Sequence, residues 1–229
     1  LLPVHWRDGW PIIGRAPDAG PGSMVWSGPK PIRSAGQAKL QTTDEFAGAK
    51  LGPQWEWNHQ PEPGSWSLSE RPGWLRLRSS RPVEPGNLAT TGSIPSQRSL
   101  RTPDNVVTVR MDVSRMADGQ HAGLAHMSNK FGSLGVRQTG GRRTLEYVEQ
   151  GRSLIGPDVP TRLIWLRSRW GSDGRSRYSY SLDGTRFLPF GATYQMTRAN
   201  YRGDRIGVYS YGRSSGGAVD FDYFRYRHQ

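Results

Sequence analysis

The sequence contains one stretch that decides its fold: residues 44–78 read DEFAGAKLGPQWEWNHQPEPGSWSLSERPGWLRLR. Tryptophans lie between prolines and glycines there, and the stretch ends in the alternating segment 74–78, WLRLR. A period of two residues is typical of a β-strand with one buried face, so we expect Leu75 and Leu77 in the core and the arginines on the opposite face. The stretch therefore predicts short strands joined by tight turns.

Two tryptophans of this stretch, Trp55 and Trp57, would share one face of a strand at 54–59 because they are two residues apart. His59 follows on that face, whereas Asn58 points the other way or occupies the next turn. Large flat rings beside short polar side chains can stack on sugar rings and bond their hydroxyls, and the same rings can equally form a sandwich core. We interpret Trp55 as a core residue. The candidates for ligand binding are Trp57, Asn58 and His59.

Short strands continue along the rest of the chain. Apolar and polar residues alternate in 105–113, NVVTVRMDV, so we expect Val107, Val109 and Met111 on one buried face. No helix longer than a turn or two is expected, and 193–202 is the best place for a short one. Turn signals recurring every 8–12 residues or so favour an all-β sandwich or barrel. Further strands are predicted at 121–127, 132–138, 143–149, 162–170, 177–187 (a hairpin turning at Asp183-Gly184), 205–211 and 218–227.

The N-terminal part differs from this pattern. Prolines and glycines recur through residues 1–33 and exclude a helix, so we expect an irregular arm. The arm carries Trp6, Trp10 and Trp26 and is too apolar for a free linker, which predicts that it lies against a protein surface. Residues 34–43 are a plausible connector, and 44–229 form the β-sandwich.

Composition narrows the possible partners. The 229 residues carry a formal net charge of +12 and no cysteine, which excludes a disulfide framework and a thiolate site. The basic residues are mostly arginines scattered singly along the chain, which favours a solvated basic strand surface over a nucleic-acid partner. No apolar run approaches the roughly 18 residues that cross a bilayer, so no membrane partner is predicted.

Several segments together resemble the C-terminal concanavalin A-like β-sandwich of glycoside hydrolase family 43 enzymes, also classed as a xylan-binding module. The likeness covers about 44–227 and is carried by WEWNH at 55–59, RPGWLRL at 71–77 and AGL at 122–124. Segment 3–14, PVHWRDGWPIIG, is similar to the segment that joins the catalytic five-bladed propeller of those enzymes to the sandwich. The resemblance implies an antiparallel jelly-roll sandwich. Family members act mostly as β-xylosidases and α-arabinofuranosidases on xylan-type glycans.

The resemblance implies an accessory module that binds xylan or xylo-oligosaccharides and accompanies the catalytic domain of the same enzyme. Candidate contacts are Trp57, Asn58, His59, Gln97 and Arg98. A loop of the sandwich can close the catalytic pocket in the family. The candidates for that role are Phe131, the one aromatic ring between 125 and 136, and the loop around Gln97 and Arg98. The first alternative is a purely structural buttress on the catalytic propeller. A second is a glycan lectin unrelated to hydrolysis.

Independent catalysis is not predicted for this chain. A glycosidase needs two carboxyl groups that face each other across the scissile bond, and a strand presents such a pair when the residues are two apart. Glu146 and Glu149 are three apart and fall on opposite faces. The chain is therefore expected to have no catalytic residues of its own.

Asp220 and Asp222 are two apart, and we expect them to share a strand face with Phe224 and Tyr226. Their oxygens suit a structural calcium ion near the paired terminal strands, with Asp44 and Glu45 as the other ligands. The alternative is that these acids form ion pairs with neighbours such as Arg225.

Overall fold

The computed structural model describes residues 2–14, 21–23, 27–29, 32–33, 36, 40, 42–81, 88–197, 203–212 and 216–229. The chain divides into two compact units, Leu1–Leu40 and Gln41–Gln229, so the boundary falls inside the connector predicted at 34–43. Each unit is described by itself below.

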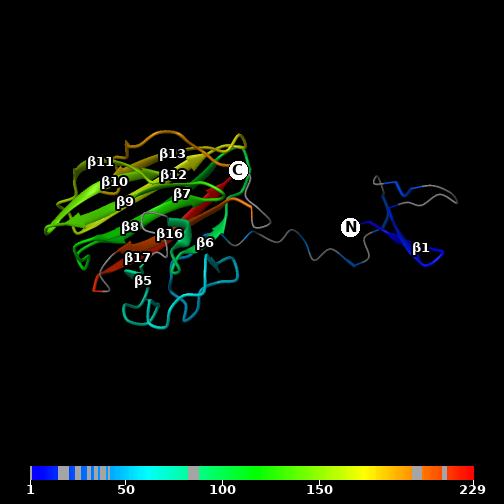
Figure 1. Cartoon of the computed structure of the whole chain (residues 1–229), viewed down its shortest axis with the longest axis horizontal. Helices are drawn as coiled ribbons and strands as arrows, with labels where there is room; N and C mark the ends of the chain where they lie inside the picture. Colours follow the sequence, from blue (N-terminus) through cyan, green and yellow to red (C-terminus); the bar gives the residue numbers. More distant parts are fainter. Residues whose placement is uncertain are drawn as a thin grey trace. The chain divides into compact units, whose positions relative to one another are not determined.

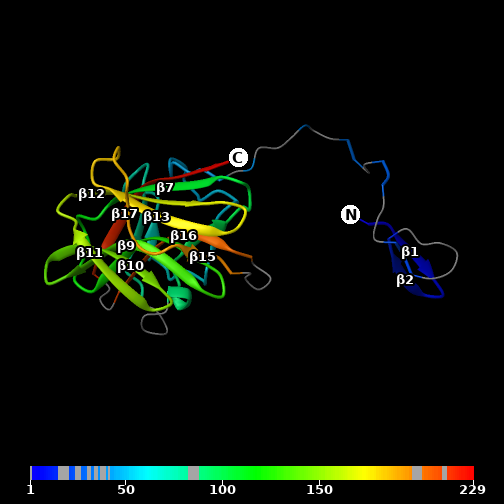
Figure 2. The same ribbon diagram turned by 90° about the horizontal axis from the view of Figure 1, so that it is seen from above.

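The larger unit is a sandwich of two antiparallel sheets (Figures 1 and 2). The seven-stranded sheet runs in the order β11 (Arg152–Asp158), β10 (Arg142–Glu149), β9 (Phe131–Thr139), β8 (Gln120–Met127), β16 (Arg205–Gly212), β6 (Pro95–Arg98), β3 (Glu56–Trp57). The eight-stranded sheet runs β14 (Leu188–Pro189), β13 (Arg175–Ser181), β12 (Leu163–Trp170), β7 (Asn105–Asp112), β17 (Ala218–His228), β5 (Leu75–Arg78), β4 (Trp66–Ser67), and β15 (Tyr194–Gln195) pairs with β13.

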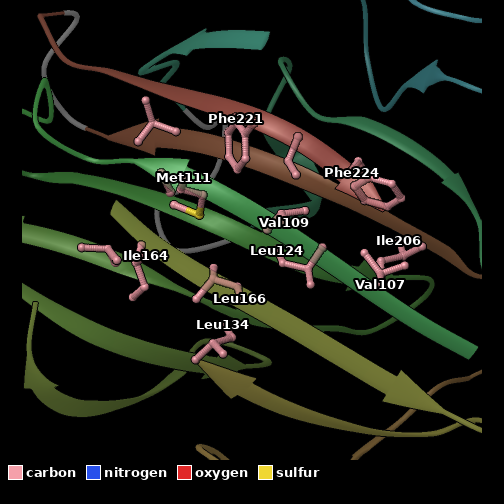
Figure 3. Close-up of a cluster of buried hydrophobic side chains, with 14 of the residues drawn as sticks. Val107, Val109, Met111, Leu124, Leu134, Ile164, Leu166, Ile206, Phe221 and Phe224 are labelled. Carbon is pink, nitrogen blue, oxygen red and sulfur yellow. The ribbon is translucent and has the colours of Figure 1, made fainter. Parts of the chain in front are cut away.

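The core lies between the two sheets, and the alternating residues supply it (Figure 3). β7 contributes Val107, Val109 and Met111, each 0% exposed, as the sequence pattern predicts. Leu75 and Leu77 on β5 are also 0% exposed. Burial of alternate side chains on facing sheets is the dominant stabilising contribution in such a sandwich. The facing and neighbouring strands contribute Leu124, Leu134, Ile164, Leu166, Ile206, Phe221 and Phe224.

A β-bulge in β17 changes which residues face the core. Phe221 pairs with Met111 and Tyr223 with Arg110, so the intervening Asp222 is the extra residue of the bulge. Phe221 and Phe224, three apart, are therefore both fully buried in the core. The prediction that Asp220 and Asp222 share a face with Phe224 and Tyr226 is wrong, because the bulge shifts the alternation by one residue.

The smaller unit contains a β-hairpin where an irregular arm was predicted. β1 (Val4–Arg7) pairs with β2 (Trp10–Ile13) across the turn Asp8-Gly9. Both turn residues have positive φ, 49° and 80°, which is the geometry of a tight two-residue hairpin and explains the Asp-Gly pair. Trp6 and Trp10 are 73% and 74% exposed, whereas Trp26 lies outside the described residues.

The segment 193–202, the best place for a short helix, contains a strand in its described part. Tyr194–Gln195 form strand β15 against β13, and 198–202 lie outside the described residues. In the described part of the chain, the one helical element is the 3-10 turn η1 (Leu88–Thr90). Gly151, with φ of 77°, is the last residue of the turn between β10 and β11. The sequence pattern does not reveal β11, because its residues are mostly exposed.

Candidate functional site

Trp55 anchors the first half of the stretch 44–78 in the core. Its side chain is 8% exposed and its ring lies 4.9 Å from that of Phe224, which confirms the core interpretation. The indole nitrogen donates to Asp44 Oδ2 at 2.8 Å. Asp44 in turn exchanges two backbone hydrogen bonds with Phe224, at 2.9 and 2.8 Å. The beginning of the sandwich is thereby tied to its last strand.

Trp57 and Trp66 meet where the two sheets end. Trp57 lies on β3, the last strand of the seven-stranded sheet, and Trp66 lies on β4, the last in the order of the eight-stranded sheet. Their ring centroids are 5.1 Å apart, with an interplanar angle of 47°. Both rings are half-buried and pack against the core. The two tryptophans therefore close this end of the sandwich and remain partly accessible.

A surface hollow of about 530 Å³ opens beside Trp66. Its walls are residues 47–49, 66–69 and 72–73. This volume is within the roughly 300–1,000 Å³ that small-molecule sites occupy. Ser67 and Ser69 place hydroxyl groups in the wall, where the Ser67 oxygen also accepts the backbone N–H of Glu70 at 3.0 Å. The hollow therefore combines an aromatic ring with fixed polar groups.

Asn58 and His59 follow Trp57 in a turn. The Asn58 backbone N–H donates to the Ile94 carbonyl at 3.0 Å, and its side-chain nitrogen donates to the Thr91 carbonyl at 3.4 Å. Asn58 is half-buried and His59 is exposed. Asn58 thus connects the stretch 44–78 to the loop before β6.

The other two predicted sugar contacts, Gln97 and Arg98, lie on β6 with opposite exposure. Gln97 is 2% exposed, and its side-chain nitrogen donates to the Thr42 carbonyl at 2.7 Å. Arg98 is exposed and lies opposite Arg205 of the neighbouring strand β16 in the sheet register. Because successive residues of a strand face opposite sides, the two cannot contact one ligand together, and Gln97 is not accessible to a sugar.

Phe131 is buried in a second, smaller apolar cluster. Its side chain is 6% exposed, and its backbone N–H donates to the Gln150 side-chain oxygen at 2.8 Å. The cluster includes Leu88 of η1. In this chain the ring is therefore part of a core and does not present a face for closing a pocket. The remaining members of the cluster are Ile94, Ala125, Met127, Val148 and Tyr209.

The four predicted calcium ligands have other partners. Asp222 pairs with Arg110 at 2.7 Å, and Glu45 pairs with Arg225 at 2.7 Å, as the alternative interpretation expects. Asp44 accepts the hydrogen bond from the Trp55 indole nitrogen. Within the residues that the structure describes, no three histidine or acidic side chains gather in a metal-binding group. These residues do not fit a calcium site, and calcium binding stays a prediction.

Asp220 belongs to a carboxylate network on the outer face of the eight-stranded sheet. It lies opposite Asp112 on β7, and both are nearly fully buried. Arg76 donates two hydrogen bonds to Asp220, at 2.7 and 2.8 Å. Arg71 bonds both carboxylates, at 2.7 Å to Asp112 and 3.0 Å to Asp220, and Arg162 bonds Asp112 at 2.7 Å. Two like charges placed opposite each other are thus neutralised by three guanidinium groups.

The pKa values in the carboxylate network follow from these contacts. Burial raises the pKa of Asp112, but the hydrogen bonds from Arg162, Ser114 and Arg71 outweigh it and hold that pKa well below its ordinary range. The hydrogen bond with Asp220 is the largest effect that raises the pKa of Arg76. Arg76 does face away from the core, as the alternation predicts, yet it is only 6% exposed because this network covers it.

A polar cluster that the sequence did not predict lies on the outer face of the seven-stranded sheet. Glu146, 4% exposed, bonds His121 Nδ1 at 2.6 Å and accepts the Ser153 hydroxyl at 2.7 Å. The His121 ring stacks on Tyr211 at 4.9 Å. Burial raises the pKa of Glu146, but the His121 hydrogen bond leads the opposing effects that lower it. Glu149 instead accepts the hydroxyl of Tyr147 at 2.8 Å.

The Ala-Gly-Leu motif has a packing reason beside this cluster. Gly123 of β8 lies directly opposite Gly135 of β9. A Cβ atom on Gly135 would overlap the Tyr209 hydroxyl, so the tyrosine side chain lies across the two glycines. The motif is therefore a requirement of close packing on this face.

One sequence family matches this architecture. Its model, described as the beta xylosidase C-terminal concanavalin A-like domain, covers residues 43–227. The chain belongs to this family. A beta-xylosidase of Formosa agariphila is 36% identical to this chain over an alignment of 248 residues, which covers 99% of the chain and 42% of that protein. The chain thus spans less than half the length of this relative.

Solved structures agree with the family assignment. A bifunctional GH43-CE protein of Bacteroides eggerthii matches 100% of this chain and 30% of its own, with 28% identity and a TM-score of 0.76. A GH43 glycoside hydrolase engineered to display both endo-xylanase and exo-arabinofuranosidase activity matches 100% of this chain and 49% of its own, with 27% identity and a TM-score of 0.74. The predicted concanavalin A-like fold and the family 43 resemblance are confirmed. No helix in the described part of this domain is long and apolar enough to cross a membrane.

Proposed function

We propose that this domain is an accessory carbohydrate-binding β-sandwich of a family 43 glycoside hydrolase that acts on xylan-type glycans. The observation that carries the proposal is the hollow beside Trp66, with the Trp57 ring packed behind it. Family membership supports the class of ligand, because the matched relative is named a beta-xylosidase.

The proposed binding mode uses the partly accessible face of Trp66. An aromatic ring that is already held by packing loses little conformational entropy when a pyranose stacks on it. Trp57 supplies that packing, and the Ser67 and Ser69 hydroxyls offer hydrogen bonds to sugar hydroxyls at the same wall. Trp57, the residue favoured from the sequence, would then act mainly by supporting Trp66.

Calorimetric titration of the 229-residue chain with xylohexaose tests this proposal, with cellohexaose as the control sugar. Trp66→Ala should weaken xylohexaose binding about tenfold, equivalent to about 1.4 kcal/mol, while circular dichroism shows that the variant remains folded at the titration temperature. Trp165→Ala, which truncates another half-buried tryptophan on β12, is the matched control and should bind like wild type. The proposal would be overturned if Trp66→Ala and Trp165→Ala bound xylohexaose with equal affinity, or if wild type gave no saturable heat with xylohexaose.

A second candidate function, the structural buttress, is favoured by the hairpin of the smaller unit. Val4, Trp6 and Ile13 share one face of the hairpin and are all more than half exposed, and neighbouring exposed apolar side chains commonly mark protein contacts. Trp10, on the other face, is 74% exposed. The hairpin would then pack on a catalytic domain such as the relatives contain. Binding of a hydrophobic dye by the chain, lost in Trp6→Ser/Trp10→Ser, together with no xylohexaose heat, would favour this function. Dye binding unchanged by the substitutions would contradict it.

A further inference from the structure

Arginines that are scattered in the sequence gather on one part of the eight-stranded sheet. In one row, Arg225 of β17 and Arg167 of β12 both pair with Thr108 of the intervening strand β7. In the next row, Val106 pairs with both Arg227 and Arg169, and Arg169 pairs with Arg177 of β13. Register partners point to the same side, and the neighbours of these arginines along each strand face the core. The arginine patch therefore comprises Arg167, Arg169, Arg177, Arg225 and Arg227 on the outer face.

Carboxylates balance only part of this charge. Arg169 pairs with Asp104 at 2.7 Å, and Arg225 pairs with Glu45 at 2.7 Å. Across the residues that the structure describes, Arg167, Arg177 and Arg227 form no ion pair. Arg167 donates to the Thr108 hydroxyl at 3.1 Å. The patch thus retains positive charge that the described part of the chain does not neutralise.

Aromatic rings hold two of the guanidinium groups in place. The Arg167 guanidinium lies 3.4 Å from the centre of the Phe187 ring, and that of Arg225 lies 4.0 Å from the centre of the Tyr223 ring. A stacked guanidinium keeps its N–H groups directed outward in one plane, which suits bidentate bonding to a planar or tetrahedral anion. The patch is therefore preorganised for an anion as well as charged.

The surroundings of Arg167 indicate that an anion would be favourable here. Burial lowers the pKa of the half-buried Arg167 guanidinium, and repulsion from Arg227 and Arg169 lowers it further. A bound anionic group would relieve that repulsion. At the β5 side of the same face, Asp112 and Asp220 supply this compensation from within the chain.

We propose that the arginine patch binds acidic glycans, with a uronate carboxylate or a sulfate group held between Arg167 and Arg227. The chemistry favours a glycan over a nucleic acid because the chain belongs to a glycoside hydrolase family and the arginines of the patch lie in two adjacent rows of one sheet. The patch lies on β17, β7, β12 and β13, whereas the hollow lies beside β4. The two sites therefore bind ligands independently of each other.

The test is titration of the 229-residue chain at low salt with four probes: oligogalacturonate, dextran sulfate, single-stranded oligo-dT and neutral xylohexaose. Arg167→Gln/Arg227→Gln should weaken binding of the acidic glycan about tenfold or more and leave xylohexaose binding unchanged. Arg115→Gln/Arg152→Gln removes the same net charge from exposed positions outside the patch and should weaken binding less than about twofold. Comparison of the first two probes tells whether carboxylate or sulfate is preferred.

Three results would overturn the proposal. Equal weakening by both double variants would mean that diffuse charge is responsible. Tighter binding of oligo-dT than of either acidic glycan, lost in Arg167→Gln/Arg227→Gln, would make the patch a nucleic-acid surface. If wild type binds neither acidic glycan, the acidic-glycan site is excluded, whether or not the chain binds xylohexaose at the hollow. If Arg167→Gln impairs folding, Arg177→Gln/Arg227→Gln replaces it, because both side chains are exposed.

Discussion

The two sides of the outer face of the eight-stranded sheet carry arginines that serve different purposes. In the carboxylate network, Arg71, Arg76 and Arg162 bond two nearly buried aspartates, and the charges are balanced inside the chain. In the arginine patch, most side chains are exposed and the described carboxylates neutralise only part of the charge. The comparison teaches that a buried, internally balanced group of charges supports the fold, whereas an exposed and unbalanced group is available for a ligand.

The largest expected effect comes from breaking the carboxylate network. Asp220→Ala leaves Arg76, which is 6% exposed, without its main partner, so the free energy of unfolding should fall by about 3–5 kcal/mol. Urea unfolding measures this loss. Asp222→Ala is the matched control, because its pair with Arg110 is more exposed, and it should cost less than about 1 kcal/mol. Similar losses in both variants would contradict the distinction.

The next prediction uses pH. The pKa of Asp112 is lowered in the folded state, so its contribution to stability is complete above its unfolded pKa of about 3.9 and is lost as pH falls toward the folded value. The difference in unfolding free energy between wild type and Asp112→Asn should therefore be constant from neutral pH to about pH 5 and shrink below about pH 4. Urea unfolding across this range measures it. A constant difference down to pH 3 would show that Asp112 is not stabilised by its arginines.

Removal of a patch arginine should have a small effect of the opposite sign. Arg167→Gln relieves repulsion from Arg227 and Arg169, so the unfolding free energy should stay within about 0.5 kcal/mol of wild type or rise slightly. Thermal unfolding of the two proteins at low salt provides the measurement. A loss above about 2 kcal/mol would place Arg167 with the structural arginines, which would weaken the contrast between the two sides.

The smallest expected effect concerns calcium at the predicted ligands. Asp220 lies beside the guanidinium groups of Arg71 and Arg76, which disfavours a cation there. The unfolding midpoint should therefore be the same in excess calcium and in EDTA. A rise with calcium that is absent in Asp220→Asn would support the calcium prediction and change the assignment of the network.

Local pattern was sufficient for much of the fold and for little of the site. The alternation in 105–113 correctly places Val107, Val109 and Met111 in the core, because side-chain direction in a strand depends only on position along it. The bulge at Asp222 is not visible in that pattern, since it depends on the pairing of β17 with β7. Gln97 and Phe131 were candidates for binding but are buried, because segments distant in sequence cover them.

The sequence by itself determined the strand periodicity, the core faces of regular strands such as β7, and the family, all of which are written in neighbouring residues or short motifs. Only the tertiary structure decided which charges meet. Arg167 and Arg227 are sixty residues apart in the chain and lie two strands apart in the sheet, while Asp112 and Asp220 become direct neighbours. Charge interactions depend on distance in space, so a list of singly scattered arginines could not distinguish the structural network from the exposed patch.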